Sequence, residues 1–191
     1  MRKLIVEEWV SLDGNVSDRN GQLDFFTNLG PEQNTYSDND QLKFLETIDT
    51  IRLGRKTYEL FVDFWPTATT EQEAIADKLN ETNKIVFSNT IHKAPWGRWA
   101  EAKVLSGDPI TAVKELKAQR GADIVLWGSI SLAQSLMKEQ LIDEYHIQLC
   151  PVLTGGGTRF FSPEMNYAQL NLSEVRQYDT GVVFLNYQKT R

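Results

Sequence analysis

Short apolar runs alternate with segments of helical periodicity along most of the chain. The runs are rich in branched side chains and too short for buried helices, so they predict strands at residues 3–9, 50–53, 84–87, 103–105, 123–127 and 145–149. Between them, apolar residues recur every three or four positions, which predicts helices at residues 40–48, 56–61, 70–81, 110–119 and 129–138. Alternating strands and helices predict an α/β fold, a mostly parallel sheet with helices on both faces.

The end of the chain has a different pattern. Two strand-like runs, residues 170–175 and 182–188, flank a polar segment from Tyr178 to Gly181. That segment is typical of a tight turn and is too short for the crossover that parallel strands need. We therefore expect the sheet to end in an antiparallel C-terminal hairpin. The polar stretch at residues 27–41 is expected to be a surface excursion within the domain.

The composition fits one folded domain that covers residues 1–191. The chain has 191 residues, of which 41% are hydrophobic and 24% are charged, so it can bury a single core and is not globally disordered. Its 20 Lys and Arg residues against 26 Asp and Glu residues give a net charge of −6. This balance argues against a main role in coating nucleic acid or an anionic membrane.

Cysteine and histidine are too scarce for a disulfide or a metal centre built from these residues. Cys150 is the only cysteine, and the two histidines, His92 and His146, lie far apart in sequence. We expect Cys150 to be a small buried residue and His146 to be a structural or interface residue. The charged N-terminal segment has no apolar stretch for a signal peptide or membrane span, so a cytoplasmic protein is expected.

Three predicted strands run into glycine or short polar residues where the next helix or loop begins. These residues are Gly54, Arg55, Lys56 and Thr57 at the first junction, Ser88 and Asn89 at the second, and Gly128 and Ser129 at the third. Exposed N–H groups at a helix start, with cations and hydroxyls beside them, favour phosphate binding. Each junction alone is also compatible with an ordinary helix start or turn, and the chain has neither a G-x-G-x-x-G fingerprint nor a P-loop. Parallel strands bring the three junctions to one edge of the sheet, which predicts a site for one extended anionic ligand.

Six segments in this order resemble the dihydrofolate-reductase-like family, in the branch shared with the reductase domain of bacterial riboflavin biosynthesis. They include Ser-Leu-Asp-Gly at residues 11–14, Leu-Gly-Arg-Lys-Thr-Tyr-Glu at 53–59, Lys-Ile-Val-Phe-Ser-Asn at 84–89 and Ile-Val-Leu-Trp-Gly-Ser at 124–129. Residues 141–151 and 155–161 complete the set, which spans nearly the whole chain. The resemblance implies a dihydrofolate-reductase-like three-layer sandwich that uses NADPH.

The same resemblance assigns the site residues. It implies that Gly54, Arg55, Lys56 and Thr57 hold the pyrophosphate and adenosine-phosphate part of NADPH, that Ser88 and Asn89 lie beside the 2′-phosphate, and that Gly128, Ser129, Ile130 and Leu132 line the nicotinamide and pyrophosphate. Trp9, Ser11, Leu12 and Asp13 are then expected beside the nicotinamide and substrate, with Trp9 and Trp65 available to stack on a flat ring. Asp13 or water is the candidate proton donor. The Gly128–Ser129 peptide bond is expected to be cis, as the matching Gly-Gly bond is in the folate-reductase relatives.

The resemblance implies an NADPH-dependent reductase that transfers a hydride to a C=N or C=O group of a small, pterin- or aminouracil-like substrate. Dihydrofolate reductase and 5-amino-6-(5-phosphoribosylamino)uracil reductase are the nearest activities. Two departures matter. Asp24 lacks the Trp- and Pro-containing frame of true dihydrofolate reductases, so dihydrofolate itself is not expected as the substrate. Ser129 replaces the second glycine of the family's Gly-Gly pair, which bears on how the backbone approaches the cofactor. The chain also lacks the His and Cys ligands of the zinc deaminase that usually accompanies the riboflavin reductases.

Two other functions stay open at this point. The chain can be a non-catalytic nucleotide- or ligand-binding module on the same fold, or its glycine-rich turns can be purely structural. The resemblance further implies a homodimer. The late part of the chain offers it apolar side chains at Tyr145, Ile147, Leu149, Val152, Phe160 and Phe161.

Overall fold

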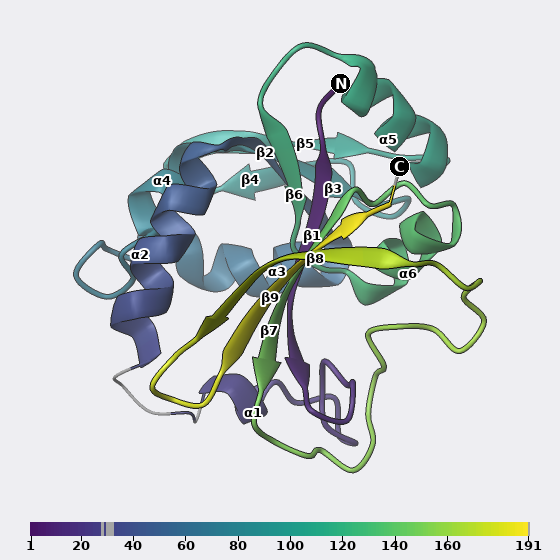
Figure 1. The fold of residues 1–191 in the computed structure, drawn as a ribbon. Helices are drawn as coiled ribbons and strands as arrows, with labels where there is room; N and C mark the ends of the chain where they lie inside the picture. Colours follow the sequence, from purple (N-terminus) through teal and green to yellow (C-terminus); the bar gives the residue numbers. More distant parts are fainter. Residues whose placement is uncertain (28, 30–32, 191) are drawn as a thin grey trace.

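The computed structural model describes residues 1–27, 29 and 33–190. Within them, nine strands form one sheet in the order β4-β5-β3-β2-β6-β1-β7-β9-β8 (Figure 1). The strands are β1 Leu4–Ser11, β2 Ile48–Gly54, β3 Asn83–Phe87, β4 Ala94–Trp96, β5 Trp99–Leu105, β6 Asp123–Leu126, β7 Glu144–Cys150, β8 Leu170–Gln177 and β9 Val183–Lys189. The helices are α1 Asp24–Thr27, α2 Gln33–Glu46, α3 Arg55–Phe64, the 3₁₀ helix η1 Trp65–Thr67, α4 Ala76–Glu81, α5 Pro109–Ala118 and α6 Ile130–Lys138.

The sheet is mostly parallel and ends in the predicted antiparallel hairpin. Parallel pairs join β5, β3, β2, β6, β1 and β7 in that order. β9 pairs antiparallel with both β7 and β8. The turn between β8 and β9 is closed by hydrogen bonds from the Tyr178 N–H to the Val182 carbonyl and from the Gly181 N–H to the Tyr178 carbonyl. Both the α/β class and the C-terminal hairpin predicted from the sequence are confirmed.

Helices cover the sheet on both sides and make three layers. α2, α3 and α4 lie on one face and α5 and α6 on the other (Figure 1). Alternate residues of β1 show why: Leu4 and Val6 pack with the α5 and α6 side chains, whereas Ile5 packs with the α2, α3 and α4 side chains. Because both faces of the parallel strands are covered, these strands are apolar on both sides, and the sequence shows them as nearly continuous apolar runs.

Three predicted elements differ from the structure. α2 begins at Gln33, so the helix predicted from residue 40 starts earlier, and the expected surface excursion at 27–41 is wrong from residue 33 onward. Residues 28 and 30–32 of that excursion lie outside the described part of the chain. The helix predicted at 70–81 covers only Ala76–Glu81, because the Gln72 and Glu73 N–H groups bond to the Thr69 carbonyl in separate turns.

β4 was not predicted from the sequence. This three-residue strand contains Pro95 and pairs antiparallel with β5, so its existence depends on its partner rather than on its own pattern. β5 is correspondingly longer than the predicted strand at 103–105. In the described residues, no helix is long and apolar enough to cross a membrane.

Candidate functional site

The carboxyl ends of β2 and β6 approach each other so closely that glycine is required on both sides. The Gly54 N–H donates to the Gly128 carbonyl over 3.3 Å. A Cβ atom on Gly54 would lie 2.4 Å from the Ser129 Cβ, and one on Gly128, whose φ is +58°, would lie 2.4 Å from the Thr57 Oγ1. The starts of α3 and α6 are therefore neighbours. The Gly128–Ser129 peptide bond between them is cis, as predicted.

Both helix starts present backbone N–H groups that no side chain caps. The N-cap of α3 is Gly54 and that of α6 is Ser129, and neither accepts an N–H bond with its side chain. The Ser129 hydroxyl lies instead 2.8 Å from the Ser131 hydroxyl. Uncapped N–H groups and the positive ends of two helix dipoles thus meet at one edge of the sheet, an arrangement that attracts phosphates.

Cationic side chains lie beside the start of α3. Arg55 forms an exposed ion pair with Glu59 at 2.7 Å, and Lys56 is exposed. Such a surface pair contributes little to stability, so the guanidinium can exchange its partner for a ligand anion. The structure thus brings Gly54, Arg55, Thr57 and the Gly128 junction together, as expected from the sequence.

Ser88 and Asn89 are already engaged in holding the loop after β3. The buried Ser88 hydroxyl accepts the N–H groups of Thr90 and Ile91 at 3.1 and 3.3 Å, and the Asn89 Oδ1 accepts the Gly107 N–H at 2.8 Å. These bonds give both residues a structural role, and the exposed Asn89 still has its amide nitrogen at the surface.

Of the two residues predicted at the start of α6, Ile130 is half-buried and Leu132 is not at the surface. Leu132 belongs to the core cluster between α6 and the sheet, and Ile130 packs against the same cluster. Leu132 is therefore a packing residue. It lies about one helical turn after Gly128, on the face of α6 that packs against the sheet.

Asp13 anchors the turn after β1 to the loop after β7. Its carboxylate accepts hydrogen bonds from the Ser11 hydroxyl at 2.7 Å, from the Thr154 N–H at 3.1 Å and from the Gly155 N–H at 2.9 Å. The Ser11 bond foremost, with the two N–H groups, lowers the pKa of Asp13 well below its usual range. Asp13 therefore stays ionised at neutral pH, which makes it a poor proton donor.

Aromatic side chains surround the end of β1 and the start of α6. Trp9 stacks on Phe26 with ring centres 5.5 Å apart. Trp65 and Trp127 each contact Phe61, at 6.0 and 6.2 Å. Leu12, by contrast, is 60% exposed. Trp65 is thus connected through Phe61 to the residue that precedes Gly128, while Trp9 lies against α1.

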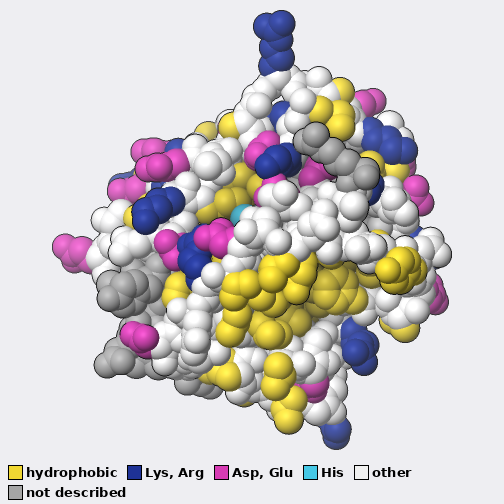
Figure 2. Space-filling model, viewed as in Figure 1, with side chains coloured by type: hydrophobic (Ala, Val, Ile, Leu, Met, Phe, Trp, Pro, Cys, Tyr) yellow, Lys and Arg dark blue, Asp and Glu magenta, His cyan; other side chains and the backbone are white. Residues whose placement is uncertain are grey.

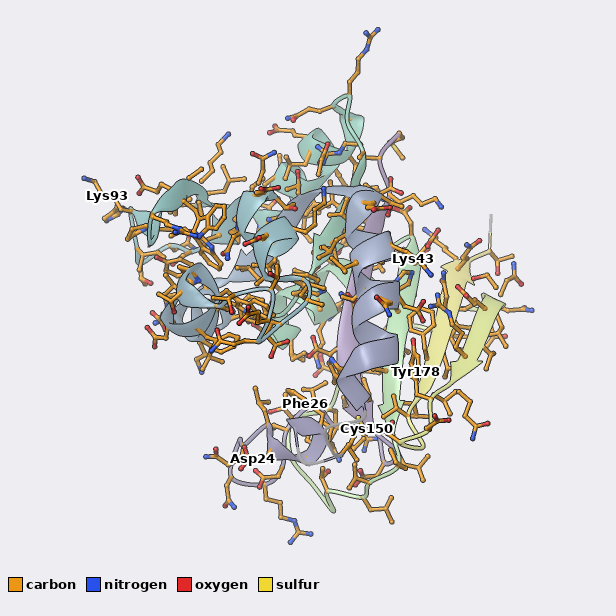
Figure 3. All side chains as sticks on the ribbon, turned by 90° about the vertical axis from the view of Figure 1, so that its left-hand side faces the viewer. Asp24, Phe26, Lys43, Lys93, Cys150 and Tyr178 are labelled. Carbon is orange, nitrogen blue, oxygen red and sulfur yellow. The ribbon has the colours of Figure 1, made fainter. Side chains whose placement is uncertain are left out.

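A cavity that the sequence did not predict lies between α2 and the face of the sheet formed by β1, β7, β9 and β8. Its volume is about 470 Å³, and its lining includes Glu7, Asp40, Phe44, His146, Gln148 and Arg176. Figure 3 shows α2 across the strands, with Lys43 and Tyr178 on the side where the hairpin approaches. The alternation of Glu144, His146 and Gln148 along β7 was the signal for a polar face, but it could not show that α2 leaves space above it.

The cavity walls hold both paired and unpaired polar groups. Arg176 pairs with Asp40 at 2.5 Å and with Glu174 at 2.6 Å, and Tyr178 donates to Asp40 at 3.1 Å. The buried Gln148 Oε1 has no hydrogen-bond partner in the part of the chain that the structure describes. Buried polar atoms are normally satisfied, so Gln148 is available to a ligand that donates hydrogen bonds.

Glu7 connects the cavity with the Gly128 junction. Its buried Oε2 accepts hydrogen bonds from the Gln41 amide at 2.7 Å and from the Trp127 indole N–H at 2.6 Å. Its neighbour Glu8 points to the opposite face of β1, and burial raises the pKa of Glu8 to about 8, with the Glu7 charge adding to the effect. Glu8 is therefore a carboxyl that stays mostly protonated at neutral pH, and no local pattern in the sequence marks it.

Comparisons with known proteins agree with this geometry. The family model of the RibD C-terminal domain matches residues 2–184. Uncharacterized protein YyaP of Bacillus subtilis (strain 168) is 29% identical over 189 residues, which cover 97% of this chain and 94% of that protein.

Two solved structures share the fold. A Shewanella sp. PV-4 protein whose description refers to riboflavin biosynthesis superposes with a TM-score of 0.79 at 24% identity, over 99% of both chains. Dihydrofolate reductase from Enterococcus faecalis, solved with NADP(H), superposes with a TM-score of 0.63 at 14% identity, over 99% of this chain and 97% of that one. These likenesses confirm the dihydrofolate-reductase-like fold.

Proposed function

Because the chain belongs to the RibD C-terminal domain family, we propose that it is an NADPH-dependent reductase of a small heterocyclic substrate. In this reaction a hydride passes to a C=N or C=O group of a pterin- or aminouracil-like molecule. The observation that carries the proposal is the contact between the starts of α3 and α6, where Gly54 and Gly128 leave no room for a side chain. This contact creates an extended strip of free N–H groups and nearby cations, which suits a dinucleotide better than a single phosphate.

The residues at this edge fit the proposed cofactor. The N–H groups at the starts of α3 and α6 would hold the pyrophosphate, and Arg55 and Lys56 would face its phosphates. Thr57 and Ser129, which flank the Gly128 contact, would add hydroxyl groups. NADPH would supply the hydride, and the protein would orient it and exclude water.

The cavity under α2 is the proposed substrate pocket. It adjoins the starts of α3 and α6 through Glu7, whose carboxylate accepts a hydrogen bond from Trp127, the residue before Gly128. Glu7 and Gln148 present acceptor oxygens, which favour a substrate with N–H donors, such as an amino-substituted heterocycle. Trp9 and Ser11 at the end of β1 would border the reacting ring, and Asp13 would hold the turn in place.

Proton supply to the product is assigned to water rather than to Asp13. The hydrogen bonds of Asp13 keep its carboxyl ionised, and the Glu8 carboxyl faces the side of β1 opposite to the proposed pocket, which Glu7 lines. A general acid has to lie within hydrogen-bond reach of the atom that it protonates, and Glu8 does not line this pocket.

Thermal unfolding with NADPH, NADH or no ligand, followed by NADPH oxidation with a panel of pterins, aminouracils and cyclic imines, tests the proposal. We expect NADPH to raise Tm more than NADH does, and at least one panel member to oxidise it. Stabilisation by NADPH without oxidation by any panel member would favour the non-catalytic binding module. Absence of stabilisation by either nucleotide would contradict both readings.

A homodimer in the cytoplasm is the remaining part of the proposal. β8 carries Leu172 and Val175, which are 50% and 53% exposed, and in register with them are the half-buried Tyr187 and Leu185 of β9. Figure 2 shows a broad hydrophobic area on the side of the molecule that faces the viewer in Figure 1. In the expected interface segment, Tyr145, Ile147 and Phe160 are buried within one chain, whereas Phe161 is 40% exposed, so Phe161 and the hairpin both contribute apolar surface.

A further inference from the structure

Arg52 is a fully buried arginine whose charge has no partner among the described residues. It lies on β2, two residues before Gly54, and its Nε, Nη1 and Nη2 atoms form no hydrogen bond with any described residue. Burial alone lowers the pKa of Arg52 to about 10, with no carboxylate contributing, so the guanidinium remains protonated at neutral pH. The guanidinium carbon lies 5.4 Å from the centre of the Phe87 ring.

The strand register places Arg52 beneath the start of α6. A Cβ atom on Gly54 would point at Ser129. Residues two apart on a strand share a face, so the Arg52 side chain lies on that same side of the sheet. Its neighbours in register are Ile85 on β3 and Leu126 on β6, both in the core cluster that α5 and α6 cover. The charge is thus surrounded by apolar groups and by the positive end of the α6 dipole.

A positive group in these surroundings does not stabilise the ligand-free fold. A buried charge without a counter-charge is unfavourable, and a hydrophobic side chain of similar size in its place is often neutral or stabilising. The Lys84 ammonium offers the contrast, because this buried cation donates hydrogen bonds to the Asn80 and Thr82 carbonyls at 2.8 Å. Arg52 has no such bonds, so its charge needs an anion from outside the chain.

We propose that Arg52 is an interior phosphate-binding residue, whose guanidinium engages a phosphoryl group bound at the start of α6. Phe87 is half-buried at the end of β3 and its ring packs on the Arg52 guanidinium, so we expect a shift of this ring to open the way for a phosphoryl group at the starts of α3 and α6. The identity of the ligand as a dinucleotide rests on the proposed function, whereas the phosphoryl chemistry follows from Arg52 itself. Arginine suits this role because its five donors match phosphate oxygens.

The test compares Arg52→Met, Arg52→Lys and the control Lys84→Met by thermal unfolding and calorimetric titration with inorganic pyrophosphate, NADPH and NADH. For Arg52→Met we expect a ligand-free Tm equal to or above that of the wild type, and a Kd for pyrophosphate and NADPH at least ~10-fold higher. Arg52→Lys keeps the charge and is expected to bind with an intermediate Kd. Lys84→Met leaves two buried carbonyls without donors, so its Tm falls while its Kd values stay at the wild-type level.

The outcomes separate this inference from the proposed function. Weaker binding of NADPH alone by Arg52→Met places the contact on the 2′-phosphate, and weaker binding of NADPH and NADH places it on the pyrophosphate. If the wild type binds pyrophosphate through Arg52 but neither dinucleotide, the phosphate site stands and the reductase proposal fails. Wild-type Kd values in Arg52→Met, or a ligand-free Tm below that of the wild type, would overturn the role of Arg52 and leave the reductase proposal intact.

Discussion

The Glu7 Oε2 atom lies 2.6 Å from the Trp127 indole nitrogen, and this bond joins the middle of β1 to the residue before the Gly128 junction. The same oxygen accepts the Gln41 amide of α2 at 2.7 Å. One carboxylate therefore fixes the position of three elements: a strand, a helix that covers the cavity, and the turn that begins α6.

Replacement of Glu7 tests whether these hydrogen bonds stabilise the fold. In Glu7→Ala the buried Trp127 N–H loses its acceptor, which costs about 1 to 3 kcal/mol and lowers Tm by several degrees. Glu7→Gln keeps an acceptor oxygen and is expected to lose much less. Thermal unfolding of both variants, with the exposed Glu59→Gln as control, is the measurement. Equal Tm values for Glu7→Ala and wild type would show that the bond does not contribute.

From the close contact between Gly54 and Ser129 we predict that a side chain at position 54 destabilises the fold. A methyl group in Gly54→Ala would meet the Ser129 Cβ at 2.4 Å, so we expect a loss of stability of about 1 to 3 kcal/mol and weaker NADPH binding. The double variant Gly54→Ala/Ser129→Gly removes that atom and is expected to recover part of both losses, although the Ser129 backbone nitrogen stays at 3.1 Å. A double-mutant cycle by denaturant unfolding measures the recovery, and purely additive losses would contradict the contact.

Local patterns in the sequence predicted much of this edge of the sheet. Gly54 and Gly128 were recognisable because each ends an apolar run and precedes a helical segment, and such a turn needs a residue without a side chain. The contact between them joins positions far apart in sequence, and the expectation that the junctions converge came from the parallel order of the strands.

Other parts of the site depend on tertiary packing and carry no local signal. Arg52 looked like one polar residue inside an apolar strand run, since nothing nearby in sequence tells that no carboxylate reaches it. The cavity lies between α2 and the strands β7, β8 and β9, and the pairing of Arg176 with Asp40 brings the hairpin to that helix. Asp13 was identified by its position, but the groups that donate hydrogen bonds to it come from Ser11 and from a loop that follows β7.

Arg55 is predicted to set the preference for NADPH. Because the 2′-phosphate adds close to two negative charges, Arg55→Ala is expected to raise the Kd for NADPH by about 10- to 100-fold and to leave that for NADH nearly unchanged. Glu59→Gln frees Arg55 from its ion pair at 2.7 Å and is expected to lower the Kd for NADPH modestly. Calorimetric titration measures both. Equal losses for the two nucleotides in Arg55→Ala would place this residue at the pyrophosphate.

The hairpin surface is predicted to hold the homodimer together. Val175→Asp or Leu172→Asp puts a charge on the exposed face of β8, where the side chain is about half exposed and the fold of one chain is not disturbed. We expect sedimentation velocity to give a dimer for the wild type and a monomer for these variants, with little change in far-UV circular dichroism. A monomeric wild type at micromolar concentration would refute the dimer.

Glu8 gives the protein a pH dependence with a definite sign. Its pKa rises from an ordinary 4.5 to about 8 on folding, so between these values the folded chain holds a proton that the unfolded chain has released. The contribution of Glu8 to stability is complete below about pH 4.5 and is lost as the pH rises to about 8, with a slope of at most ~1.4 kcal/mol per pH unit. Glu8→Gln cannot titrate, so its free energy of unfolding is expected to fall less steeply than that of the wild type over this range. Denaturant unfolding at several pH values measures the difference, with Glu59→Gln as a control that keeps the wild-type slope. Parallel curves for Glu8→Gln and wild type would mean that Glu8 is ionised in the folded chain.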